Sequence, residues 1–264
     1  MFRKNHPLAW TYHRNSSRWT GTPQTPGTSP QATAAFKEMV DLPEVPLPTA
    51  LALRQELSET IRARCSCRRF ASTEVSRQAL ATLLYWSYGK LGIDHPNGRE
   101  MVLRPVPSNG GLHPLELYVL VQRVNGLPPG VYHYNVLGHM LECLEAGALP
   151  PRLLAGLFMS QPGVEQSACQ LVVTAVFARS LGKYRDRGYR YLLLEAGHVA
   201  QNCNLAAAAL GLGSLNLGGF SDDDLGALLK LESEEEAPLY AVAIGEPDNA
   251  DGKSPRIPQP PFDI

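Results

Sequence analysis

The sequence lacks the features that most quickly assign a function. Charges interrupt every apolar run, so no membrane span is expected, and the start, MFRKNHPLAWTYHR, has no apolar core of signal-peptide length. There is no GxSxG, no P-loop and no convincing Ser-His-Asp set. A net charge of -1 and a pI near 6.7 disfavour a nucleic-acid partner. A cytoplasmic globular protein is therefore expected.

Cysteine and histidine are too scattered to predict a metal centre. The five cysteines are an odd number spread through apolar stretches, which fits a reducing compartment. Cys65 and Cys67 are too close for ordinary bridging and lack a second pair for zinc. His133 and His139 have no carboxylate or cysteine pattern around them. We predict buried or incidental thiols and no metal site.

The chain divides into an arm and one main domain. TGTPQTPGTSPQAT is rich in Pro, Thr and Gly and predicts a flexible linker, preceded by the aromatic stretch AWTYHRNSSRW. Residues 1–46 are therefore an arm and linker, and the arm either docks on the body or a partner or is disordered. Order is expected from Leu47, so that residues 47–264 form the main domain. With 44% hydrophobic residues the chain can build a sizeable core.

Hydrophobic spacing predicts a mixture of helices and strands. Helices are expected at 49–64, 76–89, 151–161, about 188–210 and 221–231, with Ser76 and Ser221 as N-caps and Gly89 as a stop. Strands are expected at 115–124, 130–144 (a hairpin turning near 137–138), 169–178 and 237–245. These elements do not alternate as regular βαβ units, which favours an α+β domain with a helix-covered sheet. The small residues that end the long helix suit a symmetric dimer.

The stretch RARCSCRRF places Arg64, Ser66 and Arg68 at alternate positions. If the segment is extended, the three side chains share one face. Two guanidinium forks and a hydroxyl on one face suit an anion such as a phosphate. The alternative is a solvated basic turn after a helix.

A loop rich in proline and glycine precedes the first long strand. Its rigid frame, paired glycines and two hydrogen-bonding side chains allow the main chain to approach a flat ligand, and they belong to Pro107, Ser108, Asn109, Gly110 and Gly111. The alternative is a simple turn.

A second glycine-rich stretch, LGLGSLNLGGF, follows a helix and is neither GxGxxG after a strand nor a P-loop. It lays main-chain amides against a planar ring, or it is a helix stop followed by a connection. Near the chain end, IGEPDNADGKSPR holds Arg256, which as a lone arginine is normally solvated.

The stretch GKYRDRGYRYLLLEAGHVAQN sets Lys183 beside Tyr184 at the mouth of the long helix. Adjacent side chains diverge within a helix or a strand, so the two groups converge on one substrate only from a loop or a helix start. Gly182 before the pair and the helix after it indicate that setting. The alternative is a surface lysine with an interface tyrosine.

Together these stretches resemble the FMN-dependent nitroreductase superfamily, specifically its SagB-type dehydrogenase branch, which includes azoline oxidases of thiazole/oxazole-modified peptide biosynthesis. The resemblance covers roughly residues 47–256 and rests on RCSCRRF, VPSNGGLHPLELYVLV, LPPGVYHYNVLGHMLECL, KYRDRGYRYLLLEAGHVAQN, ALGLGSLNLGGF and AIGEP, in the family's order. It implies a central, mostly antiparallel sheet flanked by helices. It also implies a homodimer with an extended helical interface and two FMN sites shared between subunits.

The resemblance also assigns the cofactor contacts. Arg64, Ser66 and Arg68 match the segment that holds the FMN phosphate and ribityl chain. The loop from Pro107 to Gly111 matches the one that approaches the flavin, typically from the other subunit. Gly218 and Gly219 match the stretch near the isoalloxazine. Arg256 matches a residue that reaches the phosphate. His113 departs from the branch, which usually has Tyr there.

Lys183 and Tyr184 match the Lys-Tyr pair that azoline oxidases use in catalysis. Making an azole from an azoline removes one hydride, which FMN accepts at N5, and one proton, which needs a base. Free lysine has a pKa of about 10.4, so a neutral amine requires desolvation or nearby positive charge, which Arg185 and Arg187 can supply. The implied enzyme oxidises thiazolines or oxazolines on a ribosomal or carrier-bound peptide, and oxygen reoxidises the FMN.

Two other functions stay open. A reductase of the same fold would take hydride from NAD(P)H and pass it to quinones or nitroaromatics. A flavin-binding scaffold would instead hold a cyclodehydratase or another biosynthetic partner, a role suggested by the aromatic arm.

Overall fold

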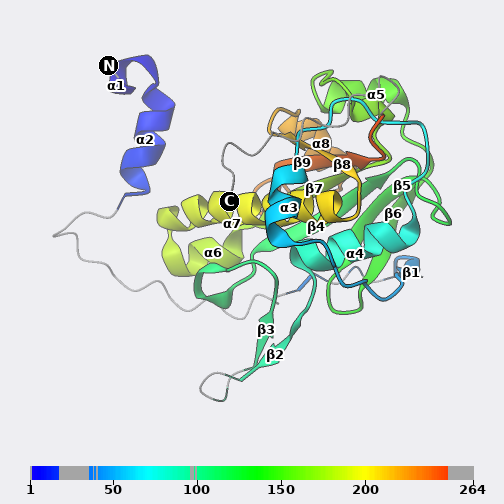
Figure 1. Ribbon diagram of the computed structural model, residues 1–264. Helices are drawn as coiled ribbons and strands as arrows, with labels where there is room; N and C mark the ends of the chain where they lie inside the picture. The colour runs from blue at the N-terminus through cyan, green and yellow to red at the C-terminus, as the bar shows by residue number, and fades with distance from the viewer. Residues whose placement is uncertain are drawn as a thin grey trace, which may run out of the picture.

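The computed structural model describes residues 2–17, 36, 37, 39, 41–95, 98 and 100–248. Its body is built around a seven-stranded sheet in the order β1-β6-β5-β4-β7-β9-β8 (Figure 1). The strands of this sheet are β1 (Glu44–Pro46), β4 (Leu115–Val121), β5 (Gly130–Asn135), β6 (Met140–Ala146), β7 (Cys169–Val176), β8 (Gly213–Leu217) and β9 (Glu236–Gly245). Neighbouring strands pair antiparallel throughout, so the antiparallel α+β fold predicted from the sequence is confirmed.

Helices cover both faces of this sheet. The helices of the body are α3 (Leu57–Ala63), α4 (Arg77–Tyr88), α5 (Pro151–Leu157), α6 (Phe177–Tyr184), α7 (Asp186–Ala209) and α8 (Asp222–Leu228), and the N-terminal arm adds α1 (Phe2–Asn5) and α2 (Pro7–Asn15). A separate hairpin of β2 (Gly92–Asp94) and β3 (Met101–Leu103) projects from the body (Figure 1). Among the described residues, none of the helices is long and apolar enough to cross a membrane.

The strand β4 shows how one sheet serves two cores. Leu117 and Val119 join the cluster that includes α4 and α7, while Tyr118 and Leu120 join the cluster that includes α5 and α8. Successive side chains of a strand point to opposite faces, so a strand covered on both sides is apolar throughout. That is why LELYVLV reads as a continuous buried run.

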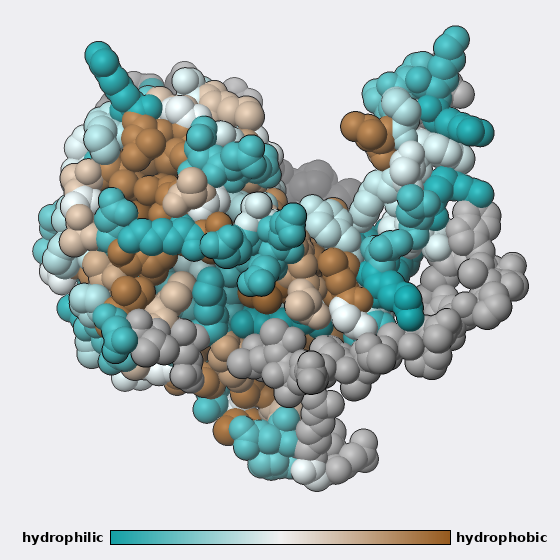
Figure 2. Space-filling model, turned by 180° about the vertical axis from the view of Figure 1, so that it is seen from behind, coloured by the Kyte–Doolittle hydropathy of each residue, from teal (hydrophilic) through white to brown (hydrophobic). Residues whose placement is uncertain are grey.

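The helix α2 is attached to the body at one end. Arg187 donates to the Ser16 carbonyl at 2.8 Å, and Arg190 donates to the Ser16 hydroxyl at 2.6 Å. The rest of the arm stands away from the body and is mostly hydrophilic, whereas the body shows apolar areas (Figure 2). At the other end of the arm region, β1 precedes Leu47 and pairs with β6.

The helix predicted at 49–64 is wrong for its first half, since α3 begins only at Leu57. The preceding residues run along α4, whose side chains bind their backbone. Thr82 accepts from the Leu51 amide at 3.0 Å, and Trp86 donates to the Leu51 carbonyl at 2.8 Å. Because these side chains satisfy the backbone groups, the segment needs no helical hydrogen bonds.

The predicted helix caps and the predicted hairpin turn agree better with the structure than the helix at 49–64 does. Ser76 accepts from the Ala79 amide at 3.1 Å, and Gly89 ends α4 as expected. Ser221 precedes α8, although its hydroxyl donates to the Asp224 carboxylate rather than capping an amide. The hairpin of β5 and β6 turns between Asn135 and Met140, as predicted.

Candidate active site

A cavity of about 280 Å³ lies where the chain after α3 meets the start of β8. Ser66 forms a parallel bridge with Ser214, and the Cys67 amide donates to the Ser214 carbonyl at 2.8 Å. The segment is therefore extended along the edge strand, which is the condition under which Arg64, Ser66 and Arg68 share a face. All three line the cavity, together with Ala208 from the end of α7 and Asp248.

The donors of this cavity suit a phosphate. Arg64 is half-buried, while Ser66 and Arg68 are exposed and open to a ligand. Arginine forks and a hydroxyl match phosphate oxygens, so the residues present fit the terminal group of FMN. Gly213 keeps the wall close, since a Cβ there would lie 2.7 Å from the Cys67 sulfur. Arg256, predicted to join them, lies outside the described residues.

Gly218 and Gly219 directly follow β8. No strand was predicted here, since the stretch was expected to be either a connection or a segment that lays main-chain amides against a planar ring. The missed signal was alternation, because Leu215 and Leu217 are buried while Asn216 between them is exposed. The strand sets the two glycines and the cavity at its opposite ends, about 16 Å apart for a strand of this length.

The loop from Pro107 to Gly111 packs against the predicted catalytic pair. Gly110 has φ 69°, and a Cβ on it would lie 2.6 Å from both the Lys183 Nζ and the Tyr184 Oη. The amine and the phenol are thus no more than twice that distance apart. A side chain at this position would therefore displace the Lys183 amine and the Tyr184 hydroxyl from the loop.

The local setting of Lys183 and Tyr184 differs from the prediction. Both belong to the last turn of α6 rather than to a loop or a helix start, and Arg185, at φ 51°, turns the chain into α7. They converge because lysine is long enough to fold back, with its Nζ 5.2 Å from the Tyr184 ring centre. Tyr191 of α7 packs edge-on against Tyr184, with ring centres 5.0 Å apart. Lys183 is exposed in the single chain.

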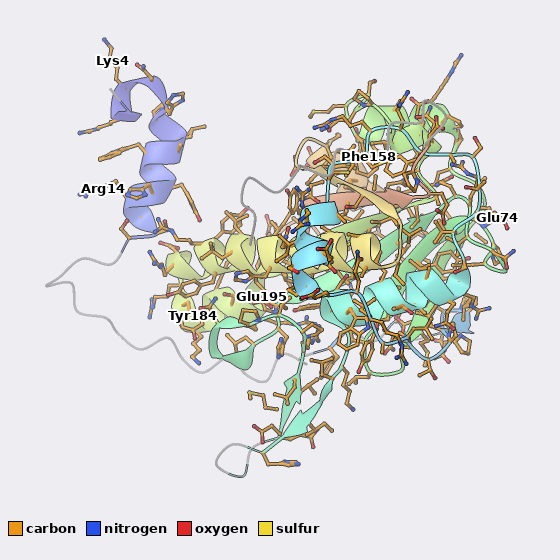
Figure 3. All side chains as sticks on the ribbon, in the orientation of Figure 1. Lys4, Arg14, Glu74, Phe158, Tyr184 and Glu195 are labelled. Atoms are coloured by element: carbon orange, nitrogen blue, oxygen red, sulfur yellow. The ribbon has the colours of Figure 1, made fainter. Side chains whose placement is uncertain are left out.

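Glu195 is a buried acid beside the same loop (Figure 3). Burial raises its pKa to about 7, although hydrogen bonds from Ser108 and Tyr88 partly oppose this shift. Tyr88 donates to its carboxylate at 3.1 Å, and Ser108 in turn accepts from the His113 amide at 2.9 Å. No local pattern in the sequence joins Glu195 to Tyr88, which lies 107 residues earlier in the chain.

The two halves of the predicted site are far apart within one chain. Lys183 and Tyr184 precede the start of α7, and Ala208 lines the cavity near its end. An α-helix rises 1.5 Å per residue, so the 22 steps from Asp186 to Ala208 span about 33 Å. A single chain therefore does not bring the cationic cavity and the Lys-Tyr pair together.

The antiparallel sheet covered by helices on both faces defines an α+β fold of the kind found in flavin oxidoreductases of the nitroreductase family. The chain belongs to the nitroreductase family, whose sequence profile matches residues 61–246. The resemblance stated from the sequence is confirmed. Over the described residues, no group of three or more potential metal ligands gathers.

The relatives with similar sequences include a nitroreductase-family protein and two proteins named for peptide processing. The nitroreductase-family protein MJ1384 of Methanocaldococcus jannaschii is 33% identical over 208 residues, 78% of this chain and 98% of its own length. The microcin B17-processing protein McbC of Escherichia coli is 33% identical over 151 residues, 55% of each chain. The trifolitoxin-processing protein TfxB of Rhizobium leguminosarum bv. trifolii is 30% identical, over 57% of this chain but 41% of its own.

Solved structures agree on the fold. A nitroreductase-family structure from Anabaena variabilis has a TM-score of 0.72 at 26% identity, covering 89% of this chain and 45% of its own. A chain of the E. coli microcin synthetase McbBCD complex with truncated pro-MccB17 bound has a TM-score of 0.59 at 24% identity, covering 91% and 92%. At that identity the second match supports the fold alone.

Proposed function

We propose that the protein is an FMN-dependent dehydrogenase that oxidises azoline rings to azoles on a peptide or carrier-bound intermediate. The observation that carries the proposal is the convergence of the Lys183 amine and the Tyr184 phenol on Gly110. The similarity to McbC and TfxB, both named as peptide-processing proteins, supports a peptide substrate. When bound, FMN supplies a two-electron acceptor for the hydride.

The residues of this chain would divide the work as follows. Lys183 Nζ takes the proton from the ring carbon next to the one that loses hydride, which requires a neutral amine. Tyr184 holds the amine by hydrogen bonding or relays its proton. The amine is exposed in the single chain, so its desolvation has to come from the substrate, the cofactor or a second copy.

The proposal includes a homodimer with shared sites. Because most of the length of α7 separates the cavity from the Lys-Tyr pair, one chain would hold the FMN phosphate and its partner would supply the loop and the pair. An antiparallel pairing of two α7 helices would bring opposite ends together. The exposed Leu193 and Leu194 on α7, 41% and 55% accessible, give such a pairing apolar contacts.

The direct test uses the flavin-loaded protein and an azoline-containing peptide, with mass spectrometry to detect loss of two hydrogens per ring. Lys183→Ala should retain FMN and lose oxidation, and Tyr184→Phe, which removes only the hydroxyl, should slow it. Lys230→Ala, a change at an exposed lysine that contacts β6, serves as the matched control. Full activity of Lys183→Ala would exclude the assigned role.

A reductase is the second candidate, because other relatives are named FMN reductase (NADPH) in Bacillus subtilis and NADPH-flavin oxidoreductase in Vibrio harveyi. These are 29% and 37% identical over 121 and 67 residues. Steady consumption of NAD(P)H with quinones or nitroaromatics, without azoline oxidation by the same preparation, would favour this candidate. The assay mixes the purified protein with NAD(P)H and an acceptor and follows the fall in NAD(P)H absorbance.

A further inference from the structure

The helix that carries Lys183 and Tyr184 is anchored from its buried side by Arg179, one turn earlier. Arg179 is 5% exposed. Its Nη1 donates to the Glu116 carboxylate at 2.6 Å and to the His113 carbonyl at 3.3 Å. One guanidinium therefore joins α6 to β4 and to the far end of the loop that contains Gly110.

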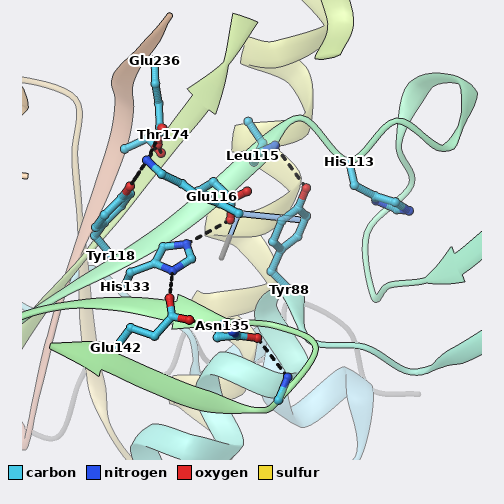
Figure 4. Close-up of polar contacts among 12 residues, drawn as sticks. Tyr88, His113, Leu115, Glu116, Tyr118, His133, Asn135, Glu142, Thr174 and Glu236 are labelled. Carbon is cyan, nitrogen blue, oxygen red and sulfur yellow. Dashed lines mark hydrogen bonds and ion pairs between the residues drawn. The ribbon is translucent and has the colours of Figure 1, made fainter. Parts of the chain in front are cut away.

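Glu116 belongs to a buried chain of charges that crosses three strands (Figure 4). His133 bonds to Glu116 at 3.1 Å and to Glu142 at 2.7 Å. Burial alone would lower the pKa of His133, but the hydrogen bonds to both carboxylates raise it overall. Burial alone would likewise raise the pKa values of Glu116 and Glu142, and the hydrogen bond from His133 helps to lower both.

The charges of this chain balance. Arg179 and protonated His133 face Glu116 and Glu142, so that two cations meet two anions. Asn135 also donates to the free oxygen of Glu142 at 2.7 Å. A balanced buried network of this kind contributes little net stability compared with apolar packing, but it fixes geometry closely. Its value to the protein therefore lies in what it holds in place.

Arg179 contacts both segments that face each other at Gly110, namely α6 and the loop before β4. On one side, Lys183 and Tyr184 follow Arg179 on α6. On the other side, the loop runs from Gly110, which touches the pair, to His113, whose carbonyl Arg179 binds. His113 has φ 44°, so its carbonyl direction depends on a backbone conformation that is uncommon outside glycine.

We propose that Arg179 is the positioning residue for the Lys183-Tyr184 pair, setting its distance from the Gly110 loop without touching the substrate. The inference rests on the proposed function for its catalytic reading. Both contacts are made by one nitrogen, Nη1, which the long arginine side chain carries to the carboxylate and the carbonyl at once. Lysine has a shorter stem, so it keeps the charge opposite Glu116 but does not reach both groups.

The kinetic test compares Arg179→Gln and Arg179→Lys in the full-length, flavin-loaded protein. Displacement of a catalytic group by about 1 Å lowers rates about 100-fold. We expect kcat to fall about 100-fold in Arg179→Gln and about tenfold in Arg179→Lys, with KM within about threefold and flavin content unchanged. Arg179→Lys keeps Glu116 paired, so it remains informative if the glutamine variant folds poorly.

The matched control removes another partly buried ion pair, whose side chains form no hydrogen bond with α6 or the loop. Lys37 bonds to Glu236 at 2.7 Å and to Tyr118 at 2.8 Å. Lys37→Met should lose stability and keep kcat. If kcat falls equally in Lys37→Met and Arg179→Lys after correction for the folded fraction, Arg179 has only a structural role and the proposal is overturned.

A second readout does not depend on azoline oxidation. Hydrogen exchange should rise about tenfold at residues 178–184 and 108–113 in Arg179→Gln, with β7 and β9 unchanged, because both segments lose one shared anchor. The rate of Lys183 acetylation should change with them. Unchanged exchange in both segments would overturn the positioning role. Absence of azoline oxidation in the wild type, with exchange altered as expected, would instead overturn the proposed function alone.

Discussion

The two ends of α7 are built on different principles. Near its end, the cavity beside β8 is lined by groups that face solvent, including exposed Ser66 and Arg68. Before its start, Lys183 and Tyr184 rest on a buried network that reaches from Arg179 to Glu142. The first end offers charge to a ligand, whereas the second fixes the position of two groups.

This difference has a chemical reason. An anion is attracted over a distance and tolerates adjustable side chains, since long arginines adapt to its oxygens. A proton transfer requires donor and acceptor within hydrogen-bond distance, so it depends on fixed geometry. Changes at the first end should therefore alter cofactor affinity by modest factors, and changes at the second should alter rates by large ones.

Among changes outside Lys183 and Tyr184 themselves, the largest effect is expected from Gly110→Ala. The added Cβ would meet both Lys183 Nζ and Tyr184 Oη at 2.6 Å and separate the loop from the pair. We expect kcat to fall at least about 100-fold with FMN retained. The matched control is Gly126→Ala, because Gly126 has the same φ of 69° and nothing within 4 Å of its Cβ position. The two variants share a backbone strain of about 1 kcal/mol, so equal activity losses would contradict the steric argument.

Glu195, in the first half of α7, should make the free energy of unfolding depend on pH. Its pKa is raised from 4.5 to about 7 by burial, so the folded protein holds this proton more tightly than the unfolded chain. The free energy of unfolding therefore falls as pH rises from about 4.5 to about 7, and Glu195 adds no further pH dependence above that range. Urea unfolding should show wild type losing roughly 2–3 kcal/mol relative to Glu195→Gln between pH 5 and pH 8.

The control for that measurement is Glu59→Gln, which alters an exposed acid paired with Arg62 on the surface of α3. Its stability relative to wild type should change little over the same pH range. Parallel pH curves for wild type and Glu195→Gln would show that Glu195 is already ionised in the folded protein at pH 5.

A complementation experiment tests whether opposite ends of α7 meet across two copies. Lys183→Ala should be nearly inactive, and the double variant Arg64→Gln/Arg68→Gln should be nearly inactive at an FMN concentration that just saturates wild type. Random mixed dimers would contain one intact shared site in half of the molecules, so about a quarter of wild-type activity should return. Differently tagged, co-expressed chains allow the mixed dimer to be isolated. If it forms but stays inactive, the two ends do not share a site.

The sequence predicted the strands β4, β5, β6, β7 and β9, and the shared face of the residues after α3, because these depend on local pattern, whereas β1, β2, β3 and β8 were missed. The apolar run of β4 and the alternation of Arg64, Ser66 and Arg68 are both visible within ten residues. The extended backbone at Ser66 agrees with that pattern. The roles of these residues stay predictions.

The fixed end of α7 was much less predictable. Arg179 is buried, which is rare for arginine, and its partner Glu116 lies 63 residues earlier in the chain. No local pattern joins residues so far apart. The helix α6 was also missed, because it follows β7 without a loop and contains Gly182, so that Lys183 and Tyr184 seemed to precede a helix rather than end one.

The smallest effect is expected at the open end of α7. Arg64→Gln removes one of the three arginines that line the cavity and leaves Arg68 and Arg69 in place. A charge-assisted hydrogen bond at a partly exposed site contributes modestly, so FMN should bind about tenfold more weakly, measured by flavin fluorescence titration. At saturating FMN, kcat should match wild type. Arg152→Gln, an exposed change on α5, controls for charge alone. A variant that binds FMN normally but turns over slowly would place Arg64 with the rate-determining groups and contradict the division between the two ends.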